Sequence, residues 1–248
     1  MATEAFNPAL IIVDLQEDFC PPNGSLAVPE GRATVAVINR LLAMPAFALR
    51  VATKDWHPQD HISFASNHPH KKPYVDSVTV TNPLNPDETP YETRLWPDHC
   101  VQNTPGAALV PELDPTGQLI DRVIEKGTNK DVEMYSAFYD PFTNPRVCDS
   151  GLAGLLKAPP PAPSSSSSSA PTKPITHVYV VGLAADYCVR CTALDSLKEG
   201  FVTYIVEEGT RAVDPKDWPS QRDELTAAGV QIVSINAPEV ARLSAKSA

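Results

Sequence analysis

The stretch His177–Gly200 decides the fold, and it reads HVYVVGLAADYCVRCTALDSLKEG. An apolar, β-branched run at 178–181 ends at Gly182 and a short loop, which predicts a buried strand. From Cys188 onward, apolar residues recur at helical spacing, which predicts a helix that begins at the cysteine. The stretch therefore predicts a strand, a tight turn and a helix, with Cys188 at the junction.

This position suits Cys188 to nucleophilic chemistry. Backbone amides and the positive end of a helix dipole lower the pKa of a thiol, and loop amides can receive an oxyanion. A small buried cysteine with a structural role is the alternative for Cys188 taken alone. The spacing to Cys191 also matches a redox dithiol, but helical periodicity places Cys191 one turn further on, facing the core.

Composition limits the class of protein. The 248 residues are enough for one substantial α/β domain, and a net charge of −10 argues against nucleic acid or an anionic membrane as a partner. No apolar run reaches the length of a transmembrane helix, and the first residues do not resemble a signal peptide. Five irregularly spaced cysteines favour a reducing compartment. We therefore expect an intracellular, cytoplasmic protein.

Strand and helix patterns alternate along the chain. Five more strands are predicted, at 9–13, 47–53, 119–125, 202–206 and 230–235, with helices at 33–43, 220–228 and from 238. This alternation predicts a three-layer, Rossmann-like α/β fold, in which helices cover both faces of a six-stranded, mainly parallel sheet. We expect residues 1–248 to form a single domain.

Prolines concentrate in two segments. One is a long loop from His68 to Pro105, and the other, at about 158–174, is rich in proline and serine. The second segment cannot bury a core and is predicted to be a disordered insertion without a catalytic role, with a linker between two domains as the alternative. The apolar residues on either side of it predict a crossover helix and the next strand of the same sheet.

Several reactive side chains follow predicted strands. Asp14, the pair Asp55 and His57, Lys126 and Cys188 each lie at or just past the end of a different strand. Because the carboxyl ends of parallel strands meet at one edge of the sheet, and ligands bind there, we expect these side chains to form one site. Taken alone, Lys126 reads as an ordinary surface lysine.

A metal site is one interpretation of the histidines. Asp55 and His57 are two residues apart, so their side chains share a face of an extended chain. The following loop adds His61, His68, His70 and His99. One carboxylate and two imidazoles form a common ligand set for Zn²⁺ or Fe²⁺. Solvated surface histidines are the alternative that spacing leaves open.

Together these groups suit the hydrolysis of an amide. Cys188 would attack, Asp14 would take its proton and deliver it to the leaving amine, and Lys126 would hold both. The metal would orient a substrate ring. Three loop aromatics, Phe19, Trp96 and Tyr135, would form the walls around that ring, although each also suits an ordinary core position.

The chain resembles the nicotinamidases of the isochorismatase-like cysteine hydrolase family, and its arrangement is most similar to fungal members. Five motifs carry the resemblance over nearly the whole chain: IIVDLQEDFC, TKDWHPQDHISF, WPDHCVQNTPGA, EKG and GLAADYCVRCTALD. The resemblance implies a catalytic triad of Asp14, Lys126 and Cys188. It also implies hydrolysis of nicotinamide to nicotinic acid and ammonia through a thioester, in NAD salvage.

The resemblance further implies the remaining parts of the site. A divalent metal, most often Zn²⁺ and otherwise Fe²⁺ or Mn²⁺, would be held by Asp55, His57 and His99. Some relatives add one ligand from the following loop, where His61, His68 and His70 are available, and we expect His61 to support the site and not to bind the metal. The backbone amides of Ala184 and Cys188 would form the oxyanion hole, with a cis peptide before Ala184. A homo-oligomer is compatible with the family. A metal-free relative that acts on a carbamoyl or ureido substrate is the alternative.

Overall fold

The computed structural model describes residues 6–157 and 173–245. Its strands and helices are β1 Pro8–Val13, α1 Val35–Leu42, β2 Leu49–Asp55, β3 Ser77–Val80, β4 Tyr91–Arg94, β5 Arg122–Lys126, α2 Leu152–Lys157, β6 His177–Leu183, α3 Arg190–Lys198, β7 Val202–Arg211, α4 Trp218–Ala228, β8 Gln231–Val233 and α5 Pro238–Ala241. Among the described residues, no helix combines the length and the apolar character needed to cross a bilayer.

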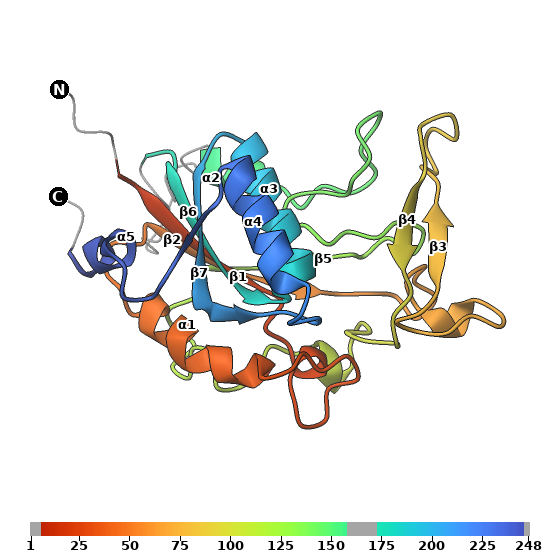
Figure 1. The fold of residues 1–248 in the computed structure, drawn as a ribbon, viewed down its shortest axis with the longest axis horizontal. Coiled ribbons are helices and arrows are strands. Elements are labelled where there is room, and N and C mark those ends of the chain that lie inside the picture. The colour runs from red at the N-terminus through yellow and green to blue at the C-terminus, as the bar shows by residue number, and fades with distance from the viewer. Residues whose placement is uncertain (1–5, 158–172, 246–248) are drawn as a thin grey trace, which may run out of the picture.

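The main sheet has six strands in the order β5-β2-β1-β6-β7-β8, and every neighbouring pair is parallel. The order reverses between β1 and β6, which is the point where parallel α/β sheets bind ligands. Helix α1 covers one face, and α3 and α4 cover the other (Figure 1). The predicted three-layer α/β fold is confirmed.

Alternation along the strands divides the core between the two faces. In β1, Leu10 and Ile12 pack toward α1, whereas Ala9 and Ile11 pack toward the α2 and α3 side. Both sets are fully buried, as expected for a central strand whose side chains point alternately to opposite faces. This burial fixes β1, and with it the position of the residue that follows.

The strand predicted at 119–125 begins later than expected. The backbone N–H groups of Leu119 and Ile120 donate hydrogen bonds of 2.7 and 3.0 Å to the Asp114 carboxylate. The carboxylate thereby holds these two residues in a turn, and pairing with β2 starts only at Arg122. Lys126 is consequently the last residue of β5 and lies opposite Asp55 in the register.

The long loop predicted from His68 to Pro105 contains a second, two-stranded antiparallel sheet formed by β3 and β4. This ribbon stands beyond the carboxyl ends of the main strands, at the right of Figure 1.

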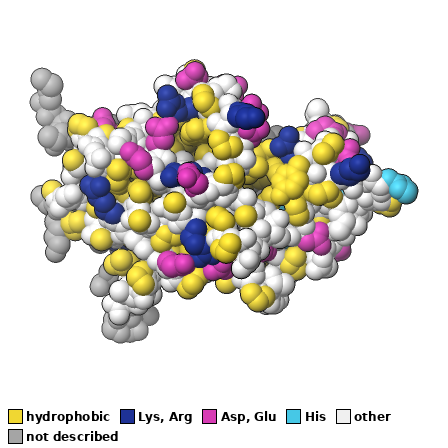
Figure 2. Space-filling model, turned by 60° about the horizontal axis from the view of Figure 1, so that its bottom comes forward, with side chains coloured by type: hydrophobic (Ala, Val, Ile, Leu, Met, Phe, Trp, Pro, Cys, Tyr) yellow, Lys and Arg dark blue, Asp and Glu magenta, His cyan; other side chains and the backbone are white. Residues whose placement is uncertain are grey.

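Figure 2 shows hydrophobic side chains on one face of the molecule, interspersed with acidic and basic ones.

Most of the predicted insertion, at 158–172, lies outside the described residues. Its last two positions, Lys173 and Pro174, are described, and their carbonyl groups accept hydrogen bonds of 2.9 and 3.1 Å from the side chain of Asn7. The end of the segment is thus tied to the start of β1. The crossover helix predicted before it is α2.

Candidate active site

The central strands end side by side and bring the predicted residues together. Asp14 follows β1, and Ala184 follows the neighbouring β6. Asp55 and Lys126 end β2 and β5, where they pair in register. All four are buried although three carry ionisable side chains, and buried charges require partners. The expected convergence at one sheet edge is therefore what the structure shows.

Cys188 lies on a π-helical turn, residues 185–189, that leads directly into α3. Its thiol is buried, with Sγ 3.7 Å from the Nζ of Lys126. A carboxylate oxygen of Asp14, one of Asp55 and the thiol sulfur all lie within 4.8 Å of one another. Single π-helical turns recur at functional sites, because they displace a side chain from the regular helical path.

Lys126 is the hub of the cluster. Its fully buried ammonium lies 2.5 Å from Asp55 Oδ1 and 3.0 Å from Asp14 Oδ2, and it donates a 3.1 Å hydrogen bond to the carbonyl of Met134. Burial opposes its charge, but the two carboxylates outweigh burial and raise the pKa of Lys126 well above its ordinary value. Lys126 is therefore a permanent buried cation and not a surface lysine.

Asp14 has the environment of an acid–base group. Burial, reinforced by the Asp55 charge, raises the pKa of Asp14 to about 6, while Lys126 and Thr53 work in the opposite direction. The Thr53 hydroxyl donates a 2.7 Å hydrogen bond to Asp14 Oδ1 and accepts one of 3.2 Å from the Asp14 N–H. A carboxyl group with a pKa near 6 can both accept and return a proton at neutral pH.

The expected lowering of the Cys188 pKa is wrong for the protein as described. Burial raises the pKa of the Cys188 thiol well above its ordinary value, Lys126 opposes this, and the charges of Asp14 and Asp55 add to it. The sequence shows the turn and the helix, but not the two carboxylates packed beside the sulfur. A buried thiol with a raised pKa needs a neighbouring base to remove its proton. The Asp14 carboxylate, within 4.8 Å of the sulfur, can act as that base.

Two histidines point equivalent nitrogens toward Asp55. Nδ1 of His57 lies 2.8 Å from the carbonyl oxygen of Gly127, and Nδ1 of His99 lies 2.8 Å from that of Pro97. Because a carbonyl only accepts, both Nδ1 atoms carry a proton, and Nε2 is the nitrogen of each ring that remains for a metal. Although burial opposes it, the Asp55 carboxylate raises the pKa of His57, so a metal that binds His57 Nε2 would displace a proton there. This backbone bond to the far nitrogen is the usual way in which proteins orient a metal-binding histidine.

The set Asp55, His57 and His99 fits a divalent metal. One ligand atom of each lies within 4.8 Å of the others, and all three residues are buried. Nε2 of His57 is buried beyond hydrogen-bond distance of any partner, and its one charged neighbour is Asp55 Oδ2 at 3.6 Å, so a cation between these two atoms would serve both. Burial, together with the His57 charge, lowers the pKa of His99 to about 4, so His99 is a neutral imidazole at pH 7.

A second cluster, Asp14, Asp55 and Cys188, also satisfies the distance criterion for metal ligands. Here, however, the ammonium of Lys126 lies between the two carboxylates and contacts both of them. A resident cation already neutralises this cluster, so a further cation would be repelled. The set of Asp55, His57 and His99 is therefore the better metal site.

The other loop histidines are occupied elsewhere. His61 is fully buried, with Nδ1 2.8 Å from the Ser63 hydroxyl and Nε2 3.3 Å from the carbonyl oxygen of Val132. Its ring packs against that of His57, with 4.0 Å between the centroids. His68 is hydrogen-bonded through Nε2 to the carbonyl of Ile62. His70 is exposed, and none of these three histidines belongs to the cluster of Asp55, His57 and His99.

A small, mostly apolar pocket opens onto Cys188 and the metal-site residues. Its lining is Phe19, Leu26, Val28, Asp55, Trp96, His99, Tyr135, Ala184, Tyr187, Cys188 and Val213. The three predicted aromatics, Phe19, Trp96 and Tyr135, are all in its wall. The Trp96 indole N–H donates a 3.0 Å hydrogen bond to the Tyr135 hydroxyl, which fixes both rings. Flat walls of this kind suit an aromatic ring.

The turn before Cys188 carries a cis peptide bond between Leu183 and Ala184, as the resemblance implied. Ala184 starts the turn and lines the pocket, and its carbonyl accepts a 3.1 Å hydrogen bond from the N–H of Val189. The residues whose amides are predicted to form the oxyanion hole, Ala184 and Cys188, therefore both border the same pocket.

Sequence reasoning missed the residue that holds Asp55 in place. The fully buried side chain of Gln16 accepts a 2.8 Å hydrogen bond from the N–H of Asp55 and donates one of 2.8 Å to the Asp55 carbonyl. A third bond, of 3.0 Å, joins Gln16 to the carbonyl of Ala107. The i, i+2 spacing of Asp14 and Gln16 was the available signal, although Glu17 and Asp18 follow directly and make Gln16 look like part of a polar loop. Its partner was not deducible from spacing.

Comparisons with known proteins agree with this geometry. The model of the Isochorismatase domain family matches residues 8–142 and 165–237. A nicotinamidase of Acinetobacter baylyi is 40% identical over 233 residues, which cover 93% of this chain and 94% of the relative. The resemblance thus extends to bacterial as well as fungal proteins.

Two solved structures are similar in backbone. A yeast nicotinamidase bound to the inhibitor nicotinaldehyde has a TM-score of 0.78 and 33% identity, over 92% of this chain and 99% of its own. A pyrazinamidase of Pyrococcus horikoshii in complex with zinc has a TM-score of 0.65 and 33% identity, over 92% and 99%. On its sequence, its fold and the arrangement of its buried site, the chain belongs to the isochorismatase family.

Proposed function

We propose that this protein is a nicotinamidase, a metal-dependent hydrolase that converts nicotinamide to nicotinic acid and ammonia. The observation that carries the proposal is the common pocket in which Cys188, Asp55 and His99 meet aromatic walls. A nucleophile and a metal site on one small, flat-walled pocket suit an aromatic ring with a short amide arm. The relatives named nicotinamidase, which match over more than nine-tenths of the chain, support the same substrate.

The reaction starts with removal of the Cys188 proton. Asp14, held ionised beside Lys126, accepts that proton, and the thiolate attacks the carboxamide carbon. The charge that develops on the carbonyl oxygen is stabilised by the backbone N–H groups of Ala184 and Cys188. Lys126 balances the negative charge on the thiolate and on Asp14 in turn, at 3.7 and 3.0 Å.

Collapse of the tetrahedral adduct breaks the carbon–nitrogen bond. Asp14 returns its proton to the departing nitrogen, ammonia leaves, and a nicotinoyl thioester remains on Cys188. Water, deprotonated by Asp14, then attacks the thioester carbon. The carbon–sulfur bond breaks, nicotinic acid leaves, and Asp14 returns the proton to the Cys188 sulfur. Asp14 thus acts twice as base and twice as acid, for which a pKa of about 6 is suitable.

Asp55, His57 and His99 would hold one divalent metal ion, for which we propose Zn²⁺. When bound, the metal supplies a Lewis acid that attracts the ring nitrogen and orients the substrate. Two imidazoles and a carboxylate are typical zinc ligands, and a zinc-bound relative supports the choice. Phe19, Trp96 and Tyr135 would form the walls around the ring.

Ammonia release from nicotinamide tests the proposal. We expect the zinc-loaded wild-type protein to release ammonia and the Cys188→Ala variant to release none. A chelator should suppress turnover by the wild type, and added zinc should restore it. Turnover of a ureido or carbamoyl compound in place of nicotinamide would contradict the proposed substrate, and chelator-insensitive turnover would contradict the metal site.

A further inference from the structure

The pocket over Cys188 is closed by only three side chains that are partly exposed. Eight of its lining residues are buried, and Tyr135, Tyr187 and Val213 are intermediate. Because a substrate must enter past exposed side chains, these three mark the mouth. The hydrogen bonds and packing contacts of each side chain decide which part of the mouth can move.

Two of the three are held by buried partners. The Tyr135 hydroxyl is 3.0 Å from both the Trp96 indole nitrogen and the Thr93 hydroxyl. The N–H of Val213 donates a 2.9 Å hydrogen bond to the buried carboxylate of Asp186, on the turn that carries Cys188. These hydrogen bonds are partly buried and so cost more to break than an exposed one, which makes these two sides of the mouth the firmer ones.

Tyr187 is held differently. Its hydroxyl accepts a 3.0 Å hydrogen bond from Nη1 of Arg94, which lies on β4 of the outlying ribbon and is exposed. The guanidinium group also lies 5.6 Å from the centre of the Trp96 ring, and that ring meets Tyr187 edge to face at 4.9 Å. Arg94 therefore bridges the mouth, from the ribbon to the residue that precedes Cys188.

We propose that Arg94 is a specificity-determining residue, which sets the size of the ring that the pocket admits by holding Tyr187 as the outer wall. The inference rests on the proposed amide hydrolysis at this pocket. With the bond in place, the Tyr187 ring stays against Trp96 and Tyr135, and a ring substituent has no room. Without it, the Tyr187 ring is held only by apolar and aromatic packing, including that against Trp96 and Tyr135, and can swing outward.

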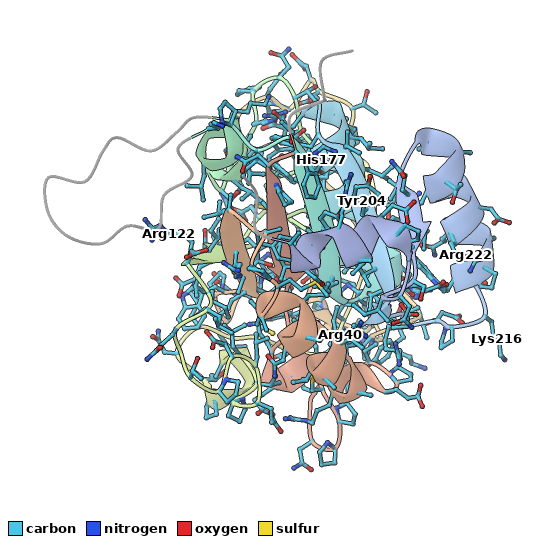
Figure 3. The ribbon with its side chains drawn as sticks, turned by 90° about the vertical axis from the view of Figure 1, so that its left-hand side faces the viewer. Arg40, Arg122, His177, Tyr204, Lys216 and Arg222 are labelled. Atoms are coloured by element: carbon cyan, nitrogen blue, oxygen red, sulfur yellow. The ribbon has the colours of Figure 1, made fainter. Side chains whose placement is uncertain are left out.

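A comparison of two substrates separates this role from a general structural one. The kcat/KM values for nicotinamide and 5-methylnicotinamide are measured for the wild type, Arg94→Met, Tyr187→Phe and the double variant. Arg222→Met serves as the control, since Arg222 projects from α4 and forms an ion pair with Glu207 at 2.9 Å (Figure 3).

We expect each single variant to raise the ratio of 5-methylnicotinamide to nicotinamide kcat/KM about two- to tenfold, the range for loss of one modest hydrogen bond. The double variant should equal the single variants, because all three lack the same bond. The Arg222→Met ratio should match the wild type. Equal losses for both substrates, or effects that multiply in the double variant, would overturn the proposal. A wild type inactive on nicotinamide would instead contradict the proposed function.

Discussion

The ammonium of Lys126 lies 2.5 Å from Oδ1 of Asp55, and this contact joins the two halves of the site. On one side the same ammonium reaches Asp14 and the Cys188 sulfur, at 3.0 and 3.7 Å. On the other side Asp55 belongs to the set that fits a metal. A change at Lys126 should therefore affect the chemistry and the metal site together.

Lys126→Met tests this coupling. The substitution leaves two buried carboxylates without their cation, so we expect the free energy of unfolding to fall by about 3–5 kcal/mol. Ammonia release should fall by at least about 10²-fold, because Asp14 is then protonated at neutral pH. Lys130→Met is the matched control, since its exposed pair with Asp131 should be worth less than about 1 kcal/mol. Urea denaturation and kinetics measure both quantities, and equal stability losses at the two positions would contradict the coupling.

Gly127→Ala tests the support of His57. Gly127 has φ +64°, and an added Cβ would lie 2.5 Å from Cε1 of the His57 ring. We expect this variant to bind zinc at least about tenfold more weakly, as losses of groups that orient a metal ligand commonly do. Gly117→Ala is the control, because Gly117 has a similar φ of +65° with nothing within 4 Å of an added Cβ. Competition with a chromogenic chelator gives both affinities, and similar values would show that His57 does not depend on Gly127.

The pH dependence of kcat/KM reports on Asp14. Below its pKa of about 6 Asp14 carries a proton and cannot accept that of Cys188, so activity should fall as the pH decreases through about 6. The Thr53 hydroxyl stabilises the ionised form. Thr53→Val should therefore move this acid limb to higher pH, and Thr53→Ser should return it toward the wild type. An acid limb that stays in place in Thr53→Val would mean that another group controls it.

His61→Phe tests whether a third histidine binds the metal. Both His61 nitrogens already face protein partners, so the variant should retain one zinc per chain after dialysis. It should lose about 1–3 kcal/mol of stability, because the Val132 carbonyl loses its hydrogen-bond partner. His99→Phe should lose the zinc. Metal content, read by elemental analysis, decides the matter, and loss of zinc from both variants would make His61 part of the metal site.

The sequence was sufficient to predict which residues meet, because parallel strands bring their carboxyl ends to one edge. Asp14, Asp55, Lys126 and Cys188 follow from that rule together with the strand patterns. The ribbon was not predictable in the same way. Its strands have only four residues each, they are largely exposed, and prolines surround them, so no periodicity emerges.

Contacts that polar side chains make with residues far away in the chain could not be predicted from the sequence either. Gln16 holds Asp55 from 39 positions away, and Arg94 reaches Tyr187 across 93. Neither pair follows from a spacing rule, since each depends on how two segments that are distant in the chain pack together. The direction of the Cys188 pKa was missed for the same reason, because burial and the neighbouring carboxylates are properties of the packed structure.

Covalent capture of the intermediate tests the central claim most directly. The zinc-loaded wild type is mixed with nicotinamide, quenched in acid within the first turnover and digested, and the peptide that carries Cys188 is weighed by mass spectrometry. We predict a gain of one nicotinoyl group on Cys188, and none in the Asp14→Asn variant. Ammonia release by the wild type without any adduct on Cys188, or with the adduct on another residue, would contradict Cys188 as the nucleophile.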